Sequence, residues 1–209
     1  RSSDLIASMT ALGAELRART KLPMGVCVLW NDYASSFAVA KAIGAQFIRV
    51  PVFVDTVQTD FGVIKGDPGA VLVARKRLQA DDVALLVDIH VKHATILSGN
   101  TIADAAQLAK DAHADGVIVT GKWTGESPSE SDLSSVRSAI GDMPVFAGSG
   151  ADEGNIGDIL RHANGVIVST SLKEGHGATT ERNVKSFMQR IDRDRVTGLV
   201  KAAKISPHT

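Results

Sequence analysis

Cysteine and long hydrophobic runs are almost absent from this sequence. Cys27 is the single cysteine among 209 residues, so no internal disulfide can form, and we expect a reducing compartment such as the cytoplasm. No apolar stretch approaches the roughly 20 residues that a membrane-spanning helix requires, and no signal peptide is recognisable. These absences disfavour a disulfide-framed secreted domain and predict no transmembrane segment.

An excess of either charge is absent as well. Lysine and arginine together number 23, as do aspartate and glutamate, so the net charge favours binding to neither nucleic acid nor an anionic membrane. The glycine fingerprint G-x-G-x-x-G does not follow the first apolar run, which disfavours a dinucleotide-binding fold. We therefore expect no nucleic-acid partner, and no cofactor is predicted.

The sequence does contain six short, β-branched apolar runs separated by segments with helical spacing. The runs occupy residues 25–30, 47–52, 83–89, 116–121, 144–150 and 165–170. Apolar strands that alternate with helices are typical of a parallel sheet with crossover helices. The pattern suits two architectures, an open doubly wound sheet and a (β/α)8 barrel.

Several of the helical segments have clear start signals. Asp67 can cap a helix that begins at Pro68, Thr101 can cap the segment after it, and Ser129 with Asp132 resembles a capping box. Further helices are expected at residues 2–19, 32–43, 155–162 and 181–204, with a frayed tail at 205–209.

We favour an α/β fold of the TIM (β/α)8 type that lacks its first two β-α units. Six strands are visible where a barrel has eight, and the helix at 2–19 precedes the first of them. The chain begins with Arg1 and not Met, which suggests processing or a fragment. No linker divides residues 1–209, so we expect a single barrel domain. Its open edges predict a homo-oligomer.

The run at 83–89 leads directly into charged and titratable residues. Because side chains alternate along a strand, Asp88, His90 and Lys92 are expected on one face, pointing toward the barrel axis. They lie at the carboxyl end of the strand, where barrel active sites occur. We predict that Asp88 and His90 act as acid and base, and that Lys92 stabilises negative charge.

Three alternatives remain open for these residues. Asp88 can instead pair with a Lys or Arg of a neighbouring strand, and a buried Lys92 can form a Schiff base. A divalent metal bound by Asp88, His90 and His93 ranks last, because a fourth firm ligand is missing.

Polar residues at other strand ends extend the predicted site. Arg49 is suited either to bind a carboxylate or phosphate or to pair internally with Asp88. Asp60 lies in a long loop at 54–69, which is typical of a lid or binding loop. The remaining candidates for substrate contact in this group are Asn31, His93, Thr120 and Gly121.

Two loops near the end of the chain resemble the halves of a phosphate site. A glycine-rich loop allows backbone N–H groups to approach an anion closely, and barrels often bind phosphate between their last two β-α loops. The loops consist of Gly148, Ser149 and Gly150 after one strand, and of Ser169, Thr170 and Ser171 after the next. We predict a small phosphorylated ligand there; the alternative is tight-turn glycines without a ligand.

The ordered motifs resemble the BtpA/SgcQ family over about residues 5 to 190. They include "GVCVLWNDYASSFAVAKAIGAQFIRV", "TDFGVIKG", "DIHVKHA", "GVIVTGKWTGE", "VFAGSG" and "GVIVSTSLKEG". The resemblance implies a ribulose-phosphate-binding TIM barrel, with one branch linked to sugar metabolism and cyanobacterial members linked to photosystem I accumulation. Trp30 replaces a basic residue of the family pattern and Phe61 enters the T-D-Q-G motif, so we expect a less polar barrel mouth.

Two hypotheses of function follow from the residues and the resemblance together. The first is an enzyme, of lyase, isomerase or hydrolase type, that acts on a small phosphorylated sugar or nucleoside-like substrate by acid–base chemistry. The second is a non-catalytic biogenesis or regulatory factor that uses the barrel as an interaction scaffold, with peripheral membrane association implied by the resemblance. Fold alone does not choose between them.

Overall fold

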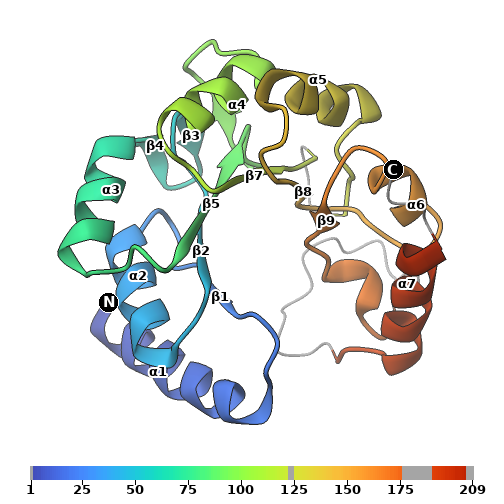
Figure 1. The fold of residues 1–209 in the computed structure, drawn as a ribbon, viewed down its shortest axis with the longest axis horizontal. Helices are drawn as coiled ribbons and strands as arrows, with labels where there is room; N and C mark the ends of the chain where they lie inside the picture. Colours follow the sequence, from blue (N-terminus) through green and yellow to red (C-terminus); the bar gives the residue numbers. More distant parts are fainter. Residues whose placement is uncertain (1, 122–124, 176–189, 206–209) are drawn as a thin grey trace.

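The computed structural model describes residues 2–121, 125–175 and 190–205. Its main feature is a sheet of six parallel strands in the order β1-β2-β5-β7-β8-β9, curled into a partial barrel (Figure 1). Each apolar run of the sequence supplies one of these strands, which confirms the predicted α/β barrel type with six strands. The strands are β1 (Gly25–Val26), β2 (Phe47–Val50), β5 (Ala84–Ile89), β7 (Gly116–Val119), β8 (Val145–Ala147) and β9 (Gly165–Val166).

Helices cover the outer, convex side of the curled sheet (Figure 1). Three predicted caps are present: the side chain of Asp67 accepts from the N–H of Ala70, Ser129 accepts from Asp132, and Thr101 forms a reciprocal capping box. The helices are α1 (Ser2–Arg19), α2 (Tyr33–Ile43), α3 (Pro68–Arg77), α4 (Ile102–Asp111), α5 (Glu130–Ile140), α6 (Ile156–Ile159) and α7 (Arg193–Ile205), with a short 3-10 helix η1 (Thr170–Leu172).

The last two predicted helices differ from the structure in length. α6 spans four residues where eight were expected at 155–162. α7 begins at Arg193 because the side chain of Asp192 accepts hydrogen bonds from the backbone N–H groups of residues 194 and 195 and so starts the helix there. Residues 181–189 of the expected helix, and 206–209 of the expected tail, lie outside the described residues.

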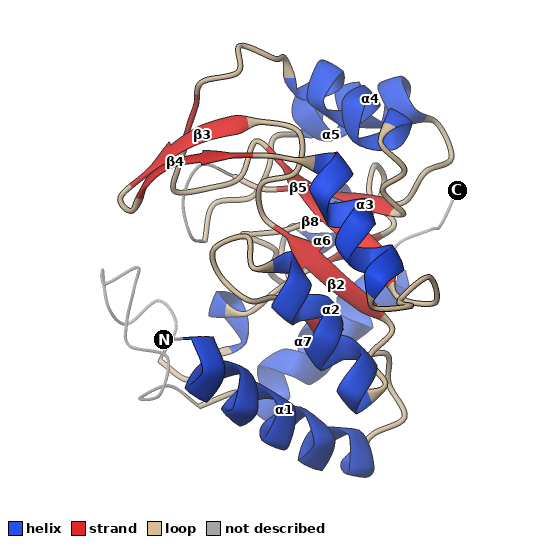
Figure 2. Ribbon diagram, turned by 90° about the vertical axis from the view of Figure 1, so that its left-hand side faces the viewer, coloured by secondary structure: helices blue, strands red, loops and turns tan. Residues whose placement is uncertain are grey.

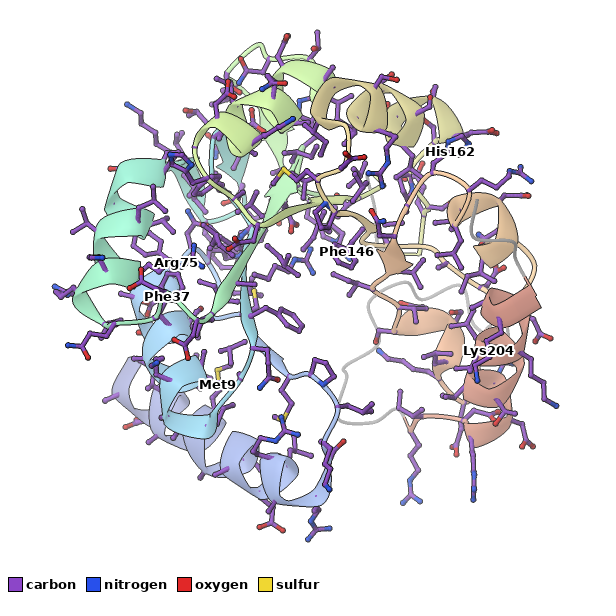
Figure 3. The ribbon with its side chains drawn as sticks, viewed as in Figure 1. Met9, Phe37, Arg75, Phe146, His162 and Lys204 are labelled. Atoms are coloured by element: carbon purple, nitrogen blue, oxygen red, sulfur yellow. The ribbon has the colours of Figure 1, made fainter. Side chains whose placement is uncertain are left out.

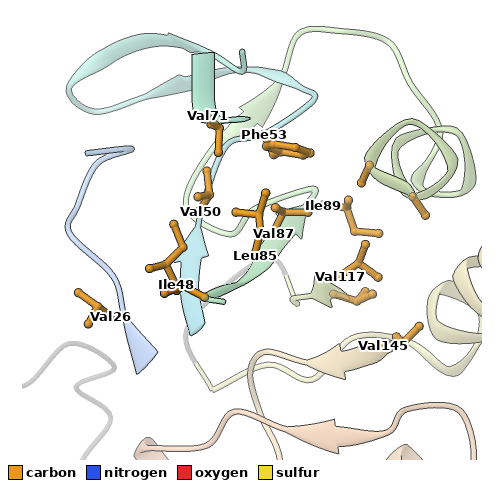
Figure 4. Packing of buried hydrophobic residues seen from close by; sticks show 14 of the residues in the cluster. Val26, Ile48, Val50, Phe53, Val71, Leu85, Val87, Ile89, Val117 and Val145 are labelled. Atoms are coloured by element: carbon orange, nitrogen blue, oxygen red, sulfur yellow. The ribbon is translucent and has the colours of Figure 1, made fainter. Parts of the chain in front are cut away.

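The core lies between the convex face of the sheet and the helices. On β5, Leu85, Val87 and Ile89 are completely buried and belong to one cluster with the alanines of α4 (Figure 4). The alternate residues, including Asp88, face the inside of the curl. Phe146 of β8 also lies on this inner side (Figure 3), where it covers the glycines of the neighbouring strands. The predicted division of β5 into a helix-facing and an inward face therefore holds up to residue 89.

The segment 54–69 is a β-hairpin and not the loop that the sequence suggested. β3 (Thr56–Thr59) pairs with β4 (Gly62–Lys65), and β6 (Thr95–Ile96) joins them in an antiparallel sheet of order β4-β3-β6. Figure 2 shows this small sheet projecting beside the carboxyl ends of the barrel strands. The buried Val57 anchors the hairpin. Val57 and Thr59 are buried and Gln58 between them is exposed, so this period of two was the strand signal in the sequence.

The alternation predicted for residues 85–92 stops earlier than expected. β5 ends at Ile89, and His90 adopts a left-handed backbone with φ +52°, as does His93 with φ +59°. A residue in this conformation turns the chain out of the extended direction, so His90 does not continue the inward face of Asp88. Within the described chain, no helix is long and apolar enough to cross a membrane.

Candidate functional site

A buried ion pair joins two strands on the inner side of the curl. Arg49 on β2 donates from Nε to Asp88 Oδ1 at 2.7 Å and from its terminal nitrogen to Asp88 Oδ2 at 2.6 Å. The Asp88 side chain is 0% exposed. Burial raises the pKa of the Asp88 carboxyl, while the hydrogen bonds and charge of Arg49 oppose this rise. This arrangement is the internal pairing that the sequence left open.

The ion pair changes what Asp88 is suited to do. Both of its oxygens accept from Arg49, and the carboxylate is shielded from solvent. A carboxylate in that environment fixes the guanidinium in place more readily than it exchanges protons with a ligand. The acid–base role of Asp88 stays a prediction, and its structural role is to hold Arg49.

Lys92 lies beside this pair and faces a cavity. Within the described residues its ammonium group has no ion-pair partner, because Asp88, the carboxylate whose charge acts on Lys92, is engaged by Arg49. Burial lowers the pKa of Lys92, and repulsion from Arg49 lowers it further, whereas Asp88 raises it. A half-buried cation of this kind favours a bound anion.

The cavity that Lys92 faces is termed here the glycine-loop cavity, and its volume is about 170 Å³. That exceeds the roughly 150 Å³ of a cavity that holds benzene, so a phosphate group can be accommodated. The predicted phosphate residues meet in it from two loops, together with Arg49 and Lys92. They are Gly148, Ser149 and Gly150 after β8, and Ser169, Thr170 and Ser171 after β9.

Close packing requires the two glycines of the first loop. A Cβ at Gly148 would lie 2.5 Å from the side chain of Ile118, and one at Gly150 would lie 2.1 Å from the backbone nitrogen of Ser127. Gly150 also has a left-handed backbone with φ +64°. Ser171 connects the second loop to the first by donating to the carbonyl oxygen of Ala151 at 2.6 Å. The cavity wall is therefore held by close packing around the two glycines and by this hydrogen bond between the loops.

A second cavity, termed the histidine cavity, lies at the ends of β5 and β7 beneath the small sheet. Its volume is about 900 Å³. Five of the predicted site residues line it: Asp60, His90, His93, Thr120 and Gly121. Burial lowers the pKa of His93, and Lys92 adds to this effect, while the carboxylate of Asp60 opposes it. The structure thus divides most of the predicted site residues between two cavities: His90 lines the histidine cavity, and Asp88 lines neither of the two.

Asn31 lines neither of these two cavities. Its amide nitrogen donates to the carbonyl oxygen of Val52 at 2.6 Å, and its amide oxygen accepts from the N–H of Val52 at 2.9 Å. These two bonds join the loops after β1 and β2. Asp32 caps α2 by accepting from the N–H of Ser35. The substrate contact expected of Asn31 remains a prediction without support from its position.

A residue that the sequence did not single out organises the histidine cavity. Asp55 is buried and accepts hydrogen bonds from Ser98 Oγ at 2.8 Å, from Asn100 Nδ2 at 3.1 Å and from the backbone N–H of His90 at 3.4 Å. These donors lie 35 to 45 positions away along the chain, so no local motif signals the cluster.

The sequence matches a known family along nearly its whole length. The model of the BtpA family covers residues 2–205. The chain belongs to the BtpA family. It is 39% identical over 199 residues to the photosystem I biogenesis protein BtpA of Synechocystis, a match that covers 95% of this chain and 66% of that protein. It is 35% identical over 205 residues to an uncharacterized protein of Pyrococcus abyssi, covering 97% and 74%. The chain thus spans about two thirds of the length of the Synechocystis relative.

Solved barrels share the fold of this BtpA-family chain. The N-(5'-phosphoribosyl)anthranilate isomerase of Pyrococcus furiosus superposes with a TM-score of 0.57 at 17% identity, over 93% of this chain and 80% of that one. The orotidine 5'-phosphate decarboxylase of Pyrococcus horikoshii superposes with a TM-score of 0.60 at 14% identity, over 94% and 81%. These likenesses show the TIM-barrel fold.

The described part of this chain contains no ligand cluster for the metal ion considered as an alternative at Asp88, His90 and His93. No group of three or more His, Cys, Asp or Glu side chains is close enough there to hold a metal ion. In particular, Asp88 is paired with Arg49, while His90 and His93 line the histidine cavity.

Proposed function

We propose that this chain binds a small phosphorylated sugar or nucleoside-like ligand in the glycine-loop cavity and acts on it as an enzyme. The observation that carries the proposal is the convergence, in one cavity, of the glycine loop, the hydroxyl-bearing turn and the Lys92 ammonium. Hydroxyl groups and a partly desolvated cation are the partners that a phosphate oxygen prefers.

The solved barrels of the same fold support the ligand class. Their names describe an isomerase acting on a 5'-phosphoribosyl compound and a decarboxylase acting on a 5'-phosphate. Since fold alone does not transfer function, the argument for this chain rests on its own cavity. The reaction type proposed is correspondingly a lyase, isomerase or hydrolase reaction.

The proposal gives each charged residue a distinct role. Lys92 neutralises charge on the ligand, and Arg49, fixed by Asp88, adds positive potential beside it. His90 transfers protons from the neighbouring histidine cavity, and Asp88 acts as a positioning residue.

Placing a negative charge in the cavity tests the phosphate site. Ser169 is exposed and lines the cavity, so Ser169→Glu should fold normally and weaken binding of inorganic phosphate by about tenfold or more through charge repulsion. Ser149→Glu should abolish binding. Ser3→Glu, the same change at an exposed position on α1, should have no effect. Isothermal titration calorimetry measures the affinities. Undetectable phosphate binding by the parent chain, or unchanged binding by Ser169→Glu, would overturn the proposal.

A separate observation favours the second candidate function, an interaction scaffold. An apolar groove lined by Leu5, Leu29, Trp30, Phe61 and Ile64 lies between α1, the loop after β1 and the hairpin. Phe61 and Leu29 are 75% and 62% exposed, and exposed apolar patches of this kind mark protein or membrane contacts. The name of the Synechocystis relative, a photosystem I biogenesis protein, agrees with such a role. Loss of partner binding in Phe61→Ser with unchanged phosphate binding would support the scaffold.

A further inference from the structure

His90 is held by hydrogen bonds at every polar group except one. Its backbone N–H donates to Asp55 Oδ2 at 3.4 Å, its carbonyl accepts from Thr120 Oγ1 at 3.3 Å, and its ring Nε2 lies 3.1 Å from the carbonyl oxygen of Asn100. A carbonyl oxygen only accepts hydrogen bonds, so Nε2 must carry a proton. In the neutral ring Nδ1 then bears the lone pair, and among the described residues nothing donates to it.

The backbone at His90 is also unusual for its place in the fold. Gln79 and His113 share the left-handed conformation, but they follow the ends of α3 and α4, where such a residue commonly terminates a helix. Asn31 and His93 share it in the loops after β1 and β5. His90 instead follows a strand. Strained backbone of this kind persists only where the surroundings impose it, and it is concentrated at binding sites. Here the backbone N–H and carbonyl of His90 are held by Asp55 and Thr120.

The histidine cavity and the glycine-loop cavity share a wall. Lys92 lines the glycine-loop cavity, while its chain neighbours Val91 and His93 line the histidine cavity. Thr120 and Gly148 meet in the same way: a Cβ at Gly148 would lie 2.8 Å from the methyl group of Thr120. A ligand whose phosphate occupies the first cavity therefore has the second cavity directly beside it.

We propose that the histidine cavity binds the hydroxyl-bearing part of the phosphorylated ligand, and that His90 Nδ1 accepts a hydrogen bond from one of its hydroxyl groups. The inference rests on the proposed function, since the phosphate must occupy the glycine-loop cavity. The lining fits a sugar-like group. Asp60 offers a further acceptor, and Ile96 and Ile102 offer an apolar surface for the C–H face of a ring.

The test compares inorganic phosphate with glycerol 3-phosphate, ribose 5-phosphate and glucose 6-phosphate by isothermal titration calorimetry. At least one of the three should bind the parent chain about tenfold more tightly than inorganic phosphate. His90→Gln keeps an N–H that can reach Asn100 but has no acceptor at the position of Nδ1. This variant should bind inorganic phosphate with the affinity of the parent chain. It should no longer bind the sugar phosphate more tightly than inorganic phosphate. His113→Gln makes the same change at an exposed position with a left-handed backbone. It should still bind the sugar phosphate more tightly than inorganic phosphate.

The outcomes separate the two proposals. Absence of binding for all four probes would overturn the proposed function together with this inference. Two results would overturn this inference alone. One is that the parent chain binds inorganic phosphate but none of the three organic phosphates more tightly. The other is that His90→Gln still binds a sugar phosphate more tightly than inorganic phosphate. An independent measurement keeps the inference testable if His90→Gln unfolds: long-range ¹H–¹⁵N spectra of the parent chain should show His90 with its proton on Nε2. The Nδ1 resonance should shift with the sugar phosphate and not with inorganic phosphate.

Discussion

At the scale of single residues, the site depends on how charges are paired. Arg49 and Asp88 pair with each other, and both Arg49 and Lys92 line the glycine-loop cavity, so Lys92 is the lining cation without an ion-pair partner among the described residues. The same pairing explains why Asp88 is better suited to positioning than to proton transfer.

Removal of the Asp88 charge should destabilise the fold. In Asp88→Asn the guanidinium of Arg49 stays in the interior without its carboxylate, which costs about 3 kcal/mol in the free energy of unfolding. Urea denaturation measures the loss. Asp82→Asn breaks an exposed pair with Lys41 and should change the stability little. Equal effects of the two substitutions would contradict the structural role given to Asp88.

Removal of the Lys92 charge should have the opposite effect on stability. Because burial and Arg49 lower the pKa of Lys92, the folded chain binds this proton less tightly than the unfolded chain does. Lys92→Met should therefore be more stable at neutral pH by about 0.5 kcal/mol, while it loses phosphate binding. The difference in stability between Lys92→Met and the parent chain should shrink as the pH rises from the lowered pKa toward 10.5, the ordinary value for lysine. The reason is that Lys92 then becomes neutral in both the folded and the unfolded chain. Thermal unfolding across this pH range measures it; a difference independent of pH would refute the explanation.

At the scale of elements, the small antiparallel sheet and the loop after β5 form one unit. β6 in that loop pairs with β3 of the hairpin, and Asp55 just before β3 ties the loop at both of its ends. The geometry of His90 therefore depends on a segment 35 residues earlier in the chain.

Loss of Asp55 should loosen this unit without unfolding the barrel. Asp55→Ala leaves the donors of Ser98, Asn100 and His90 without their acceptor, at a cost of about 2 kcal/mol. Hydrogen exchange should accelerate across residues 90–100 and remain slow in β5 and β7, because local opening affects a cooperative unit. Ser98→Ala removes a single donor and should give a smaller effect. Uniform acceleration over the whole sheet would argue against a separate unit.

At the scale of the whole molecule, the curl leaves two sheet edges. β1 and β9 end the strand order, and neither has a second partner strand among the described residues. Beside β1, the helix α1 exposes Leu5, Leu12 and Leu16 along one stripe, with Leu12 65% exposed. Unpaired edges next to apolar surface promote association.

We therefore expect the 209-residue chain to self-associate in solution. Analytical ultracentrifugation should show species larger than 22.0 kDa, and Leu12→Glu should shift them toward the monomer. Leu108→Glu introduces the same charge at an exposed leucine of α4, away from both edges (Figure 1), and should not do so. A stable monomer of the parent chain would rule the expectation out.

The sequence by itself determined the features that depend on near neighbours. The apolar runs specified six strands, although β1 and β9 are only two residues long. Asp67, Thr101 and Ser129 specified helix starts, because a cap acts within one turn of the helix. The predicted phosphate residues also meet in one cavity, because loops after neighbouring parallel strands lie at the same edge of a sheet.

Only the tertiary structure decided which of the remaining polar residues pair with each other and which line a cavity. Arg49 and Asp88 lie 39 positions apart and pair because β2 and β5 are neighbours in the sheet. His90 leaves the inward face of β5 because Asp55 and Thr120, 35 and 30 positions away, hold its backbone in the left-handed conformation. A local pattern predicts which residues can alternate along a strand, but the length of the strand depends on contacts that exist only once distant segments have come together.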